Sequence, residues 1–80
     1  MTQKTAFDRE VDCYGLWCPM PIVKASEEMA RMADGAVLKI ISTDDAAEED
    51  FRAWSRKTGN TFLECTRDGE LLEIYIRKGA

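Results

Sequence analysis

The segment 15–21, which reads Gly-Leu-Trp-Cys-Pro-Met-Pro, constrains the fold more than any other part of the chain. A proline disfavours helical geometry in the residue before it, so we expect Cys18 to be extended and to end the approach from a preceding strand. Pro19 and Pro21 lack an amide N–H and have φ preset near the helical value, so both are tolerated in the first turn of a helix. The segment therefore predicts a strand-to-helix junction with Cys18 at or beside the helix N-cap.

The same junction favours a reactive thiol. The positive end of the helix dipole and the free amides of the first turn, beginning with Met20, stabilise a thiolate. We therefore expect the pKa of Cys18 to be lowered, and we expect Gly15 to allow a sharp turn that leaves the sulfur accessible. The alternative is that Cys18 is a small buried hydrophobic residue in a rigid connection.

Apolar periodicity along the rest of the chain predicts the order βαβαββ. In the last predicted strand Leu72, Ile74 and Ile76 point to one face, which two amphipathic helices are available to cover. We therefore predict an α/β (α+β) two-layer sandwich, with a four-stranded mixed sheet and both helices on one face. The predicted strands are 7–13, 36–42, 61–66 and 71–77, and the predicted helices are 21–33 and a second one that opens at 43–45 and ends near residue 58.

Acidic residues gather where the second predicted helix begins. Asp45 and Glu48 form an Asp-x-x-Glu variant of the capping box. Glu49 and Asp50 add negative charge at the end of the helix where the dipole stabilises it. Capping explains this run without a metal ion, because a cation site would also need carboxylates that converge from elsewhere.

Composition limits the location and the partners of the chain. Its 80 residues make one domain, which we assign to residues 7–80 behind a flexible tail at residues 1–6. No apolar run approaches the roughly 20 residues of a membrane span and no signal-peptide pattern is present, so we expect a cytoplasmic protein. The net charge is −4 and the basic residues are scattered, which disfavours direct nucleic-acid binding. An odd number of cysteines, three, fits a reducing compartment.

The cysteine pattern points to an isolated nucleophile. The chain contains no histidine, which excludes Cys-His proteases and the usual histidine-containing zinc sites. Four residues separate Cys13 from Cys18, so the Cys-x-x-Cys motif of thioredoxin-like proteins is absent. No paired-cysteine spacing links these two residues with Cys65, so we predict no metal site.

The segment 11–21 reads Val-Asp-Cys-Tyr-Gly-Leu-Trp-Cys-Pro-Met-Pro. It resembles the N-terminal signature of the TusA/SirA-like sulfur carriers, which is roughly Leu-Asp-x-x-Gly-x-x-Cys-Pro-x-Pro, and the likeness covers about residues 9–78. The resemblance implies the same βαβαββ fold, similar to the C-terminal domain of bacterial initiation factor three. It also implies that Cys18 carries a persulfide from a sulfur donor to an acceptor protein, with Gly15, Pro19 and Pro21 supporting the motif. One departure is Asn60, where many family members have histidine.

A persulfide carrier of this kind requires no cofactor, because the sulfur itself is held transiently on Cys18. The resemblance implies a carrier rather than a stand-alone enzyme, with a donor such as a cysteine desulfurase or a rhodanese and an acceptor such as a DsrE-like sulfurtransferase. We expect a monomer that docks through Leu16, Trp17 and Met20, since exposed Trp and Met suit transient contacts. The alternative for Trp17 is that it packs over the helix start.

Two further interpretations stay open. Cys13 is either an inward-facing strand residue in register with Val11, which we favour, or a resolving thiol that forms an internal disulfide with Cys18. Cys65 lies in a late strand and is predicted to be structural. The main rival to a sulfur carrier is a redox-sensing or regulatory module with a reversible Cys13–Cys18 disulfide, and a third possibility is a purely structural interaction domain.

Overall fold

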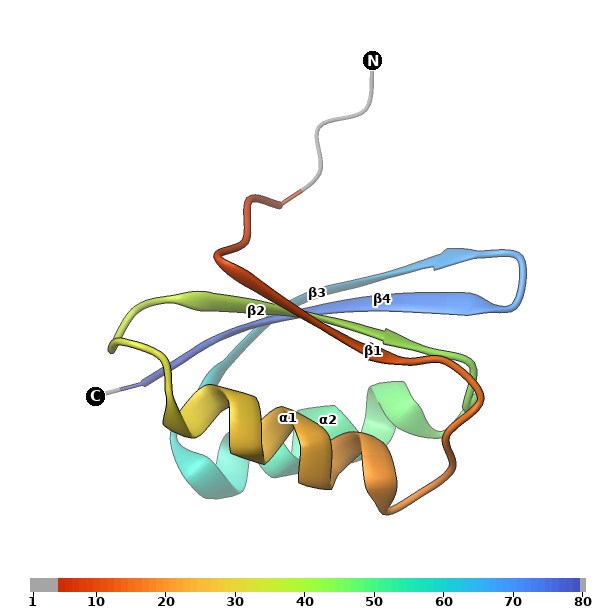
Figure 1. The fold of residues 1–80 in the computed structure, drawn as a ribbon, viewed down its shortest axis with the longest axis horizontal. Coiled ribbons are helices and arrows are strands. Elements are labelled where there is room, and N and C mark those ends of the chain that lie inside the picture. The colour runs from red at the N-terminus through yellow and green to blue at the C-terminus, as the bar shows by residue number, and fades with distance from the viewer. Residues whose placement is uncertain (1–4, 80) are drawn as a thin grey trace.

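The computed structural model describes residues 5–79, which form two layers: a four-stranded sheet and two helices that lie on one face of it (Figure 1). The predicted order βαβαββ and the two-layer architecture are confirmed. The elements are β1 (Arg9–Cys13), α1 (Met20–Ala30), β2 (Val37–Ser42), α2 (Ala47–Thr58), β3 (Thr61–Asp68) and β4 (Leu71–Arg77). Neither helix in this part of the chain is long and apolar enough to cross a membrane.

The sheet has the strand order β1-β2-β4-β3, with β1 parallel to β2 and the other neighbours antiparallel. The parallel pair requires a crossover, and α1 supplies it. The β3–β4 hairpin needs only a short turn: Asp68 pairs with Leu71, so Gly69 and Glu70 form it, with Gly69 at φ +62°. Consequently the carboxyl ends of β1 and β2 lie at the same edge of the sheet, next to the starts of both helices (Figure 1).

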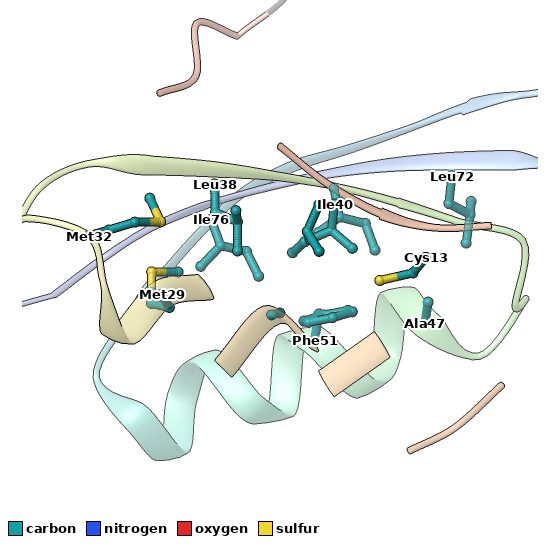
Figure 2. Packing of buried hydrophobic residues seen from close by; sticks show 12 residues of the cluster. Cys13, Met29, Met32, Leu38, Ile40, Ala47, Phe51, Leu72 and Ile76 are labelled. Carbon is teal, nitrogen blue, oxygen red and sulfur yellow. The ribbon is translucent and has the colours of Figure 1, made fainter. Parts of the chain in front are cut away.

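The core lies between the sheet and the helices, as Figure 2 shows. Alternate residues of β2 and β4 face the helices, because successive strand side chains point to opposite faces. Phe51 from α2 is fully buried against them. The other buried apolar members of this cluster are Val11, Cys13, Ala25, Met29, Met32, Leu38, Ile40, Ala47, Leu72, Ile74 and Ile76.

The first strand is shorter than predicted. It begins at Arg9, and Phe7 lies over the opposite face of the sheet, where its ring centroid is 6.2 Å from that of Tyr75. Alternation alone does not reveal this, because Phe7 has the parity of the core residues. Of the predicted tail at residues 1–6, residues 1–4 lie outside the described part of the chain. The Thr5 hydroxyl donates a hydrogen bond of 2.8 Å to Glu64 of β3.

The start of α2 also differs from the prediction. The helix begins at Ala47, and no side chain caps it, so the predicted Asp45–Glu48 capping box is wrong. Asp44 closes the turn instead: its Oδ1 accepts the Ala46 amide at 3.0 Å and its carbonyl accepts the Ala47 amide at 2.9 Å. An Asp side chain that accepts the amide of the residue two positions later forms an Asx-turn. Asp45 instead pairs with Arg67, at 3.2 Å between the carboxylate and the guanidinium.

Candidate functional site

Cys18 lies in the loop 14–19, between the end of β1 and the start of α1. The loop turns sharply at its beginning, where the Leu16 amide donates to the Cys13 carbonyl at 3.1 Å. Gly15 has φ +76°, a conformation that glycine adopts without steric cost, so the predicted turn at Gly15 is confirmed. This turn leaves the side chain of Cys18 exposed, and the interpretation of Cys18 as a buried residue is wrong.

Two hydrogen bonds attach this loop to the segment between β2 and α2. The Gly15 amide donates to Thr43 Oγ1 at 3.0 Å, and the Cys18 amide donates to Asp44 Oδ2 at 3.2 Å. Asp44 is only 7% exposed, and its own amide donates to Ser42 Oγ at 3.1 Å. Both contacts span more than 25 residues of sequence, as the 28- and 26-residue separations show. They hold the backbone of the cysteine in place while its sulfur remains accessible.

The start of α1 offers fewer free amides than predicted. The N-cap is Pro19, so Cys18 lies directly before it, and the peptide bond between these two residues is cis. The Met20 amide, expected to be free, donates to the Trp17 carbonyl at 2.9 Å. Pro21, the second helical residue, has no amide to offer. The helix start therefore has little with which to stabilise a thiolate.

The pKa of Cys18 is raised above its ordinary value, so the predicted lowering is wrong. Although the side chain is exposed, partial desolvation by neighbouring atoms is the largest cause. The negative charge of Asp50, the hydrogen bond that the thiol donates to the Asp50 carboxylate, and the charge of Asp44 follow in that order. A negative charge beside the sulfur disfavours the thiolate. In the free protein Cys18 is therefore mainly a thiol at neutral pH.

A groove of about 300 Å³ opens beside Cys18, between α1 and α2. Ile22 contributes to its lining from α1, whereas both charged residues, Asp50 and Lys57, come from α2. Trp54, which also lines a second hollow of about 360 Å³ near the C-terminal ends of both helices, is shared between the two. The residues that line the groove are Cys18, Ile22, Asp50, Ala53, Trp54 and Lys57.

Comparison with known proteins places the chain in a family. The family model described as sulfurtransferase TusA matches residues 9–78, a range that includes the whole sheet and both helices. The chain belongs to the TusA sulfurtransferase family. The sulfur carrier protein TusA of Allochromatium vinosum is 39% identical over 72 residues, which cover 90% of this chain and 95% of that protein. Its family membership makes this chain a sulfur carrier protein in the broad sense.

Other relatives agree with this assignment. YrkI of Bacillus subtilis is 40% identical over 72 residues, which cover 90% of this chain and 96% of YrkI. A longer relative from Aquifex aeolicus is 41% identical over 73 residues, which make up 37% of its length. The crystal structure of a SirA-like protein from Desulfitobacterium hafniense superposes with a TM-score of 0.74, covering 91% of this chain and all of that one. At 22% identity this last likeness shows a shared fold.

The residues that support the TusA-type motif have different environments. Trp17 is 69% exposed and Met20 is 45% exposed, so Trp17 does not pack over the helix start. Leu16 is half-buried and packs against the core, so it is less available to a partner than predicted. Pro21, in the first turn of α1, is buried, whereas Pro19 is exposed. The docking role of these residues remains a prediction.

The two other cysteines are less exposed than Cys18. Cys13 is completely buried, and in Figure 2 its sulfur points into the layer between the sheet and Phe51. Its inward orientation is confirmed, and burial is the main cause of its raised pKa. Cys65 on β3 is half-buried against the core, and burial followed by the charge of Glu48 raises its pKa to about 11. Within residues 5–79, no three His, Cys, Asp or Glu side chains gather in a way that could hold a metal ion.

Two residues acquire roles that sequence reasoning did not assign. Asp44 supports the Cys18 backbone; the sequence signals for it were an acidic pair directly after a central strand and the likeness of that pair to the TusA/SirA-like family. Asn60, which replaces the common histidine, donates through Nδ2 to Thr58 Oγ1 at 2.8 Å and accepts the Gly79 amide at 2.8 Å. It lines the second hollow rather than the groove beside Cys18. Its contacts tie the end of α2 to the end of the chain.

Proposed function

We propose that this protein accepts sulfane sulfur as a persulfide on Cys18 and passes it to a thiol of an acceptor protein. The observation that carries the proposal is the combination of an exposed sulfur with a firmly held backbone. The Cys18 amide is fixed by Asp44, while its side chain is open to solvent beside a groove. A carrier needs this arrangement because its sulfur must reach two different proteins in turn.

Both transfers are exchange reactions between sulfur atoms. In the first, the Cys18 thiolate attacks the terminal sulfur of a donor persulfide, the donor's S–S bond breaks, and the donor cysteine leaves with the electron pair and takes up a proton. In the second, an acceptor thiolate attacks the terminal sulfur on Cys18, and Cys18 leaves as a thiolate that is then protonated. Rates depend on the thiolate fraction, the nucleophilicity and the access to sulfur. Each step balances without a cofactor.

The donor in this scheme is a protein such as a cysteine desulfurase or a rhodanese, and the acceptor is a sulfurtransferase such as a DsrE-like protein. Trp17 and Met20 flank Cys18 and are exposed, which supports a docking surface around the sulfur. A small contact of this kind suits a carrier that binds and releases its partners quickly.

The redox-sensing alternative has less support. It requires Cys13 and Cys18 to form a disulfide, yet the sulfur of Cys13 is enclosed in the hydrophobic core. Bringing it to the surface would expose the layer between β1 and the helices. A carrier requires only Cys18.

The test is the intact mass of the reduced protein after exposure to a cysteine desulfurase with cysteine, or to polysulfide. We expect the gain of one sulfur atom, reversible by reductant, in the wild type and in Cys13→Ser and Cys65→Ser. We expect no gain in Cys18→Ser. Loss of two hydrogens in place of the added sulfur, abolished by either Cys13→Ser or Cys18→Ser, would identify a disulfide switch and overturn the carrier proposal.

A further inference from the structure

Asp50 of α2 lies beside Cys18, which is in the loop before α1. Asp50 is in the first turn of α2, 32 positions after Cys18 in the sequence, and both residues line the groove between α1 and α2. After desolvation, the charge of this carboxylate and its interaction with the thiol are the next causes of the raised pKa of Cys18. The other charged groups that face the sulfur or the groove are Asp44, from the β2–α2 segment, and Lys57, farther along α2.

Asp44 and Asp50 have different tasks at this site. Both oxygens of Asp44 are engaged by backbone amides, Oδ2 by Cys18 and Oδ1 by Ala46, and the side chain is buried. Asp44 therefore maintains the shape of the loop. Asp50 is half-buried and lines the groove beside the sulfur. Removing its charge changes the field at the sulfur without removing a backbone contact of the loop.

A fixed negative charge beside a nucleophilic sulfur discriminates between reaction partners. An incoming group with its own negative charge near the reacting sulfur meets repulsion from Asp50 and from the developing thiolate. An incoming ammonium or guanidinium offsets both charges and favours the thiolate, because opposite charges within a few ångströms stabilise the ionised form. The charge of the partner, rather than the helix dipole, then decides when Cys18 becomes reactive.

We propose that Asp50 is a specificity-determining residue that restricts Cys18 to reaction partners with a positive charge beside their reacting sulfur. The inference rests on the proposed carrier function and adds to it a rule for the choice of partner. Donor and acceptor proteins that satisfy the rule have a lysine or arginine next to the reacting cysteine. Small anionic sulfur compounds, and thiols that carry a carboxylate near the sulfur, react poorly with Cys18 in the free protein.

The experiment uses three symmetric disulfides of similar size on the full-length protein at neutral pH: cystamine, which is cationic, bis(2-hydroxyethyl) disulfide, which is neutral, and dithiodipropionate, which is anionic. The Cys18 thiolate attacks one sulfur, the S–S bond of the probe breaks, and the released half leaves as a thiol. Mass spectrometry of peptides measures the adduct on Cys18 alone. A peptide of residues 15–21 supplies the intrinsic rate ratio of the probes.

Relative to that peptide, we expect the wild type to favour cystamine over dithiodipropionate by about tenfold, which corresponds to one unit charge acting over a few ångströms at a protein surface. Asp50→Asn, which keeps the shape and removes the charge, should reduce this preference to about twofold and speed the reaction with the neutral probe. Asp50→Glu keeps the charge and should keep the preference for cystamine. High salt should weaken this preference in the wild type.

Glu49→Gln is the matched control, because Glu49 is the adjacent acidic residue of the same helix turn and is exposed. It removes the same charge from α2 and should leave the preference unchanged. An equal preference in the wild type and Asp50→Asn, or an equal loss in Glu49→Gln, would overturn the inference. These probes need no persulfide, so a charge preference without sulfur loading would refute the carrier function alone, and sulfur loading without a charge preference would refute the role of Asp50 alone.

Discussion

The first turns of the two helices differ in the charge that they place near the cysteines around them. The first turn of α1 contains no acidic residue, and it lies directly after Cys18, where a helix start is expected to favour a thiolate. The first turn of α2 contains three acidic residues: Glu48, Glu49 and Asp50. After desolvation, the largest cause at both cysteines, the charge of Asp50 raises the pKa of Cys18 and the charge of Glu48 raises the pKa of Cys65.

The difference teaches that a helix start acts on a thiol only through groups that remain free. In α1 the dipole has few unpaired amides behind it, because Trp17 and the prolines occupy those positions. In α2 the dipole stabilises carboxylates, and those carboxylates project toward neighbouring elements. The first turn of α2, rather than that of α1, therefore places negative charge near both Cys18 and Cys65.

The largest loss of stability should come from removing Asp44, whose carboxylate connects the loop before α1 with the turn before α2. In Asp44→Ala, the amides of Cys18 and Ala46 lose their acceptor, and we expect a loss of about 3 kcal/mol in the free energy of unfolding, since hydrogen bonds to a buried charge are among the stronger ones. Urea unfolding measures it. Asp45→Ala is the control: its surface pair with Arg67 should contribute less than about 1 kcal/mol. Equal losses in the two variants would show that the link has no special weight.

A smaller loss of stability is expected from substituting the glycine in the loop before α1 or the glycine at the end of α2. Gly15 and Gly59 have nearly equal positive φ angles, +76° and +79°, and an added Cβ would meet no neighbour within 4 Å at either position. Gly15→Ala and Gly59→Ala should therefore each lower the free energy of unfolding by about 1 kcal/mol through backbone strain alone. Only Gly15→Ala should change the rate at which iodoacetamide alkylates Cys18. A change of that rate in Gly59→Ala would contradict the local role of the loop.

The acidic turn of α2 can be divided residue by residue. Glu48→Gln removes the charge that acts on Cys65, so the pKa of Cys65 should fall and its alkylation at mildly alkaline pH should rise about threefold. The alkylation of Cys18 should not change, because Glu48 is not among the causes of its raised pKa. Peptide mass spectrometry after a short alkylation measures both sites in one sample. A rise at both cysteines would mean that the charge of the turn acts as a whole.

The smallest effect is on stability at high pH. The folded-state pKa of Cys65, about 11, lies above the ordinary value of 9.0, so the folded protein retains this proton where the unfolded chain releases it. This contribution to stability is fully present below pH 9 and is lost as the pH rises toward 11. Unfolding curves across this range should fall more steeply for the wild type than for Cys65→Ser. Parallel curves would show that the thiol does not contribute.

Most of the fold was predictable because its signals are local. Alternation in β4, the Asp68-Gly69 turn and the prolines at the start of α1 each depend on residues within a few positions of one another. The errors occurred where a distant contact overrides a local pattern. Phe7 has the parity of a core residue and yet packs on Tyr75, on the opposite face of the sheet. The turn before α2 is closed by Asp44, which also holds the loop of Cys18.

By itself the sequence determined the order of the elements, the position of Cys18 before a helix and the sharp turn at Gly15, because backbone sterics and side-chain periodicity act over short distances. Only the tertiary structure decided how reactive Cys18 is. Its pKa is raised by desolvation and then by the charge of Asp50, which approaches the sulfur only when α2 packs beside α1. Electrostatic effects follow distance in space, and for residues 32 positions apart the fold alone sets that distance.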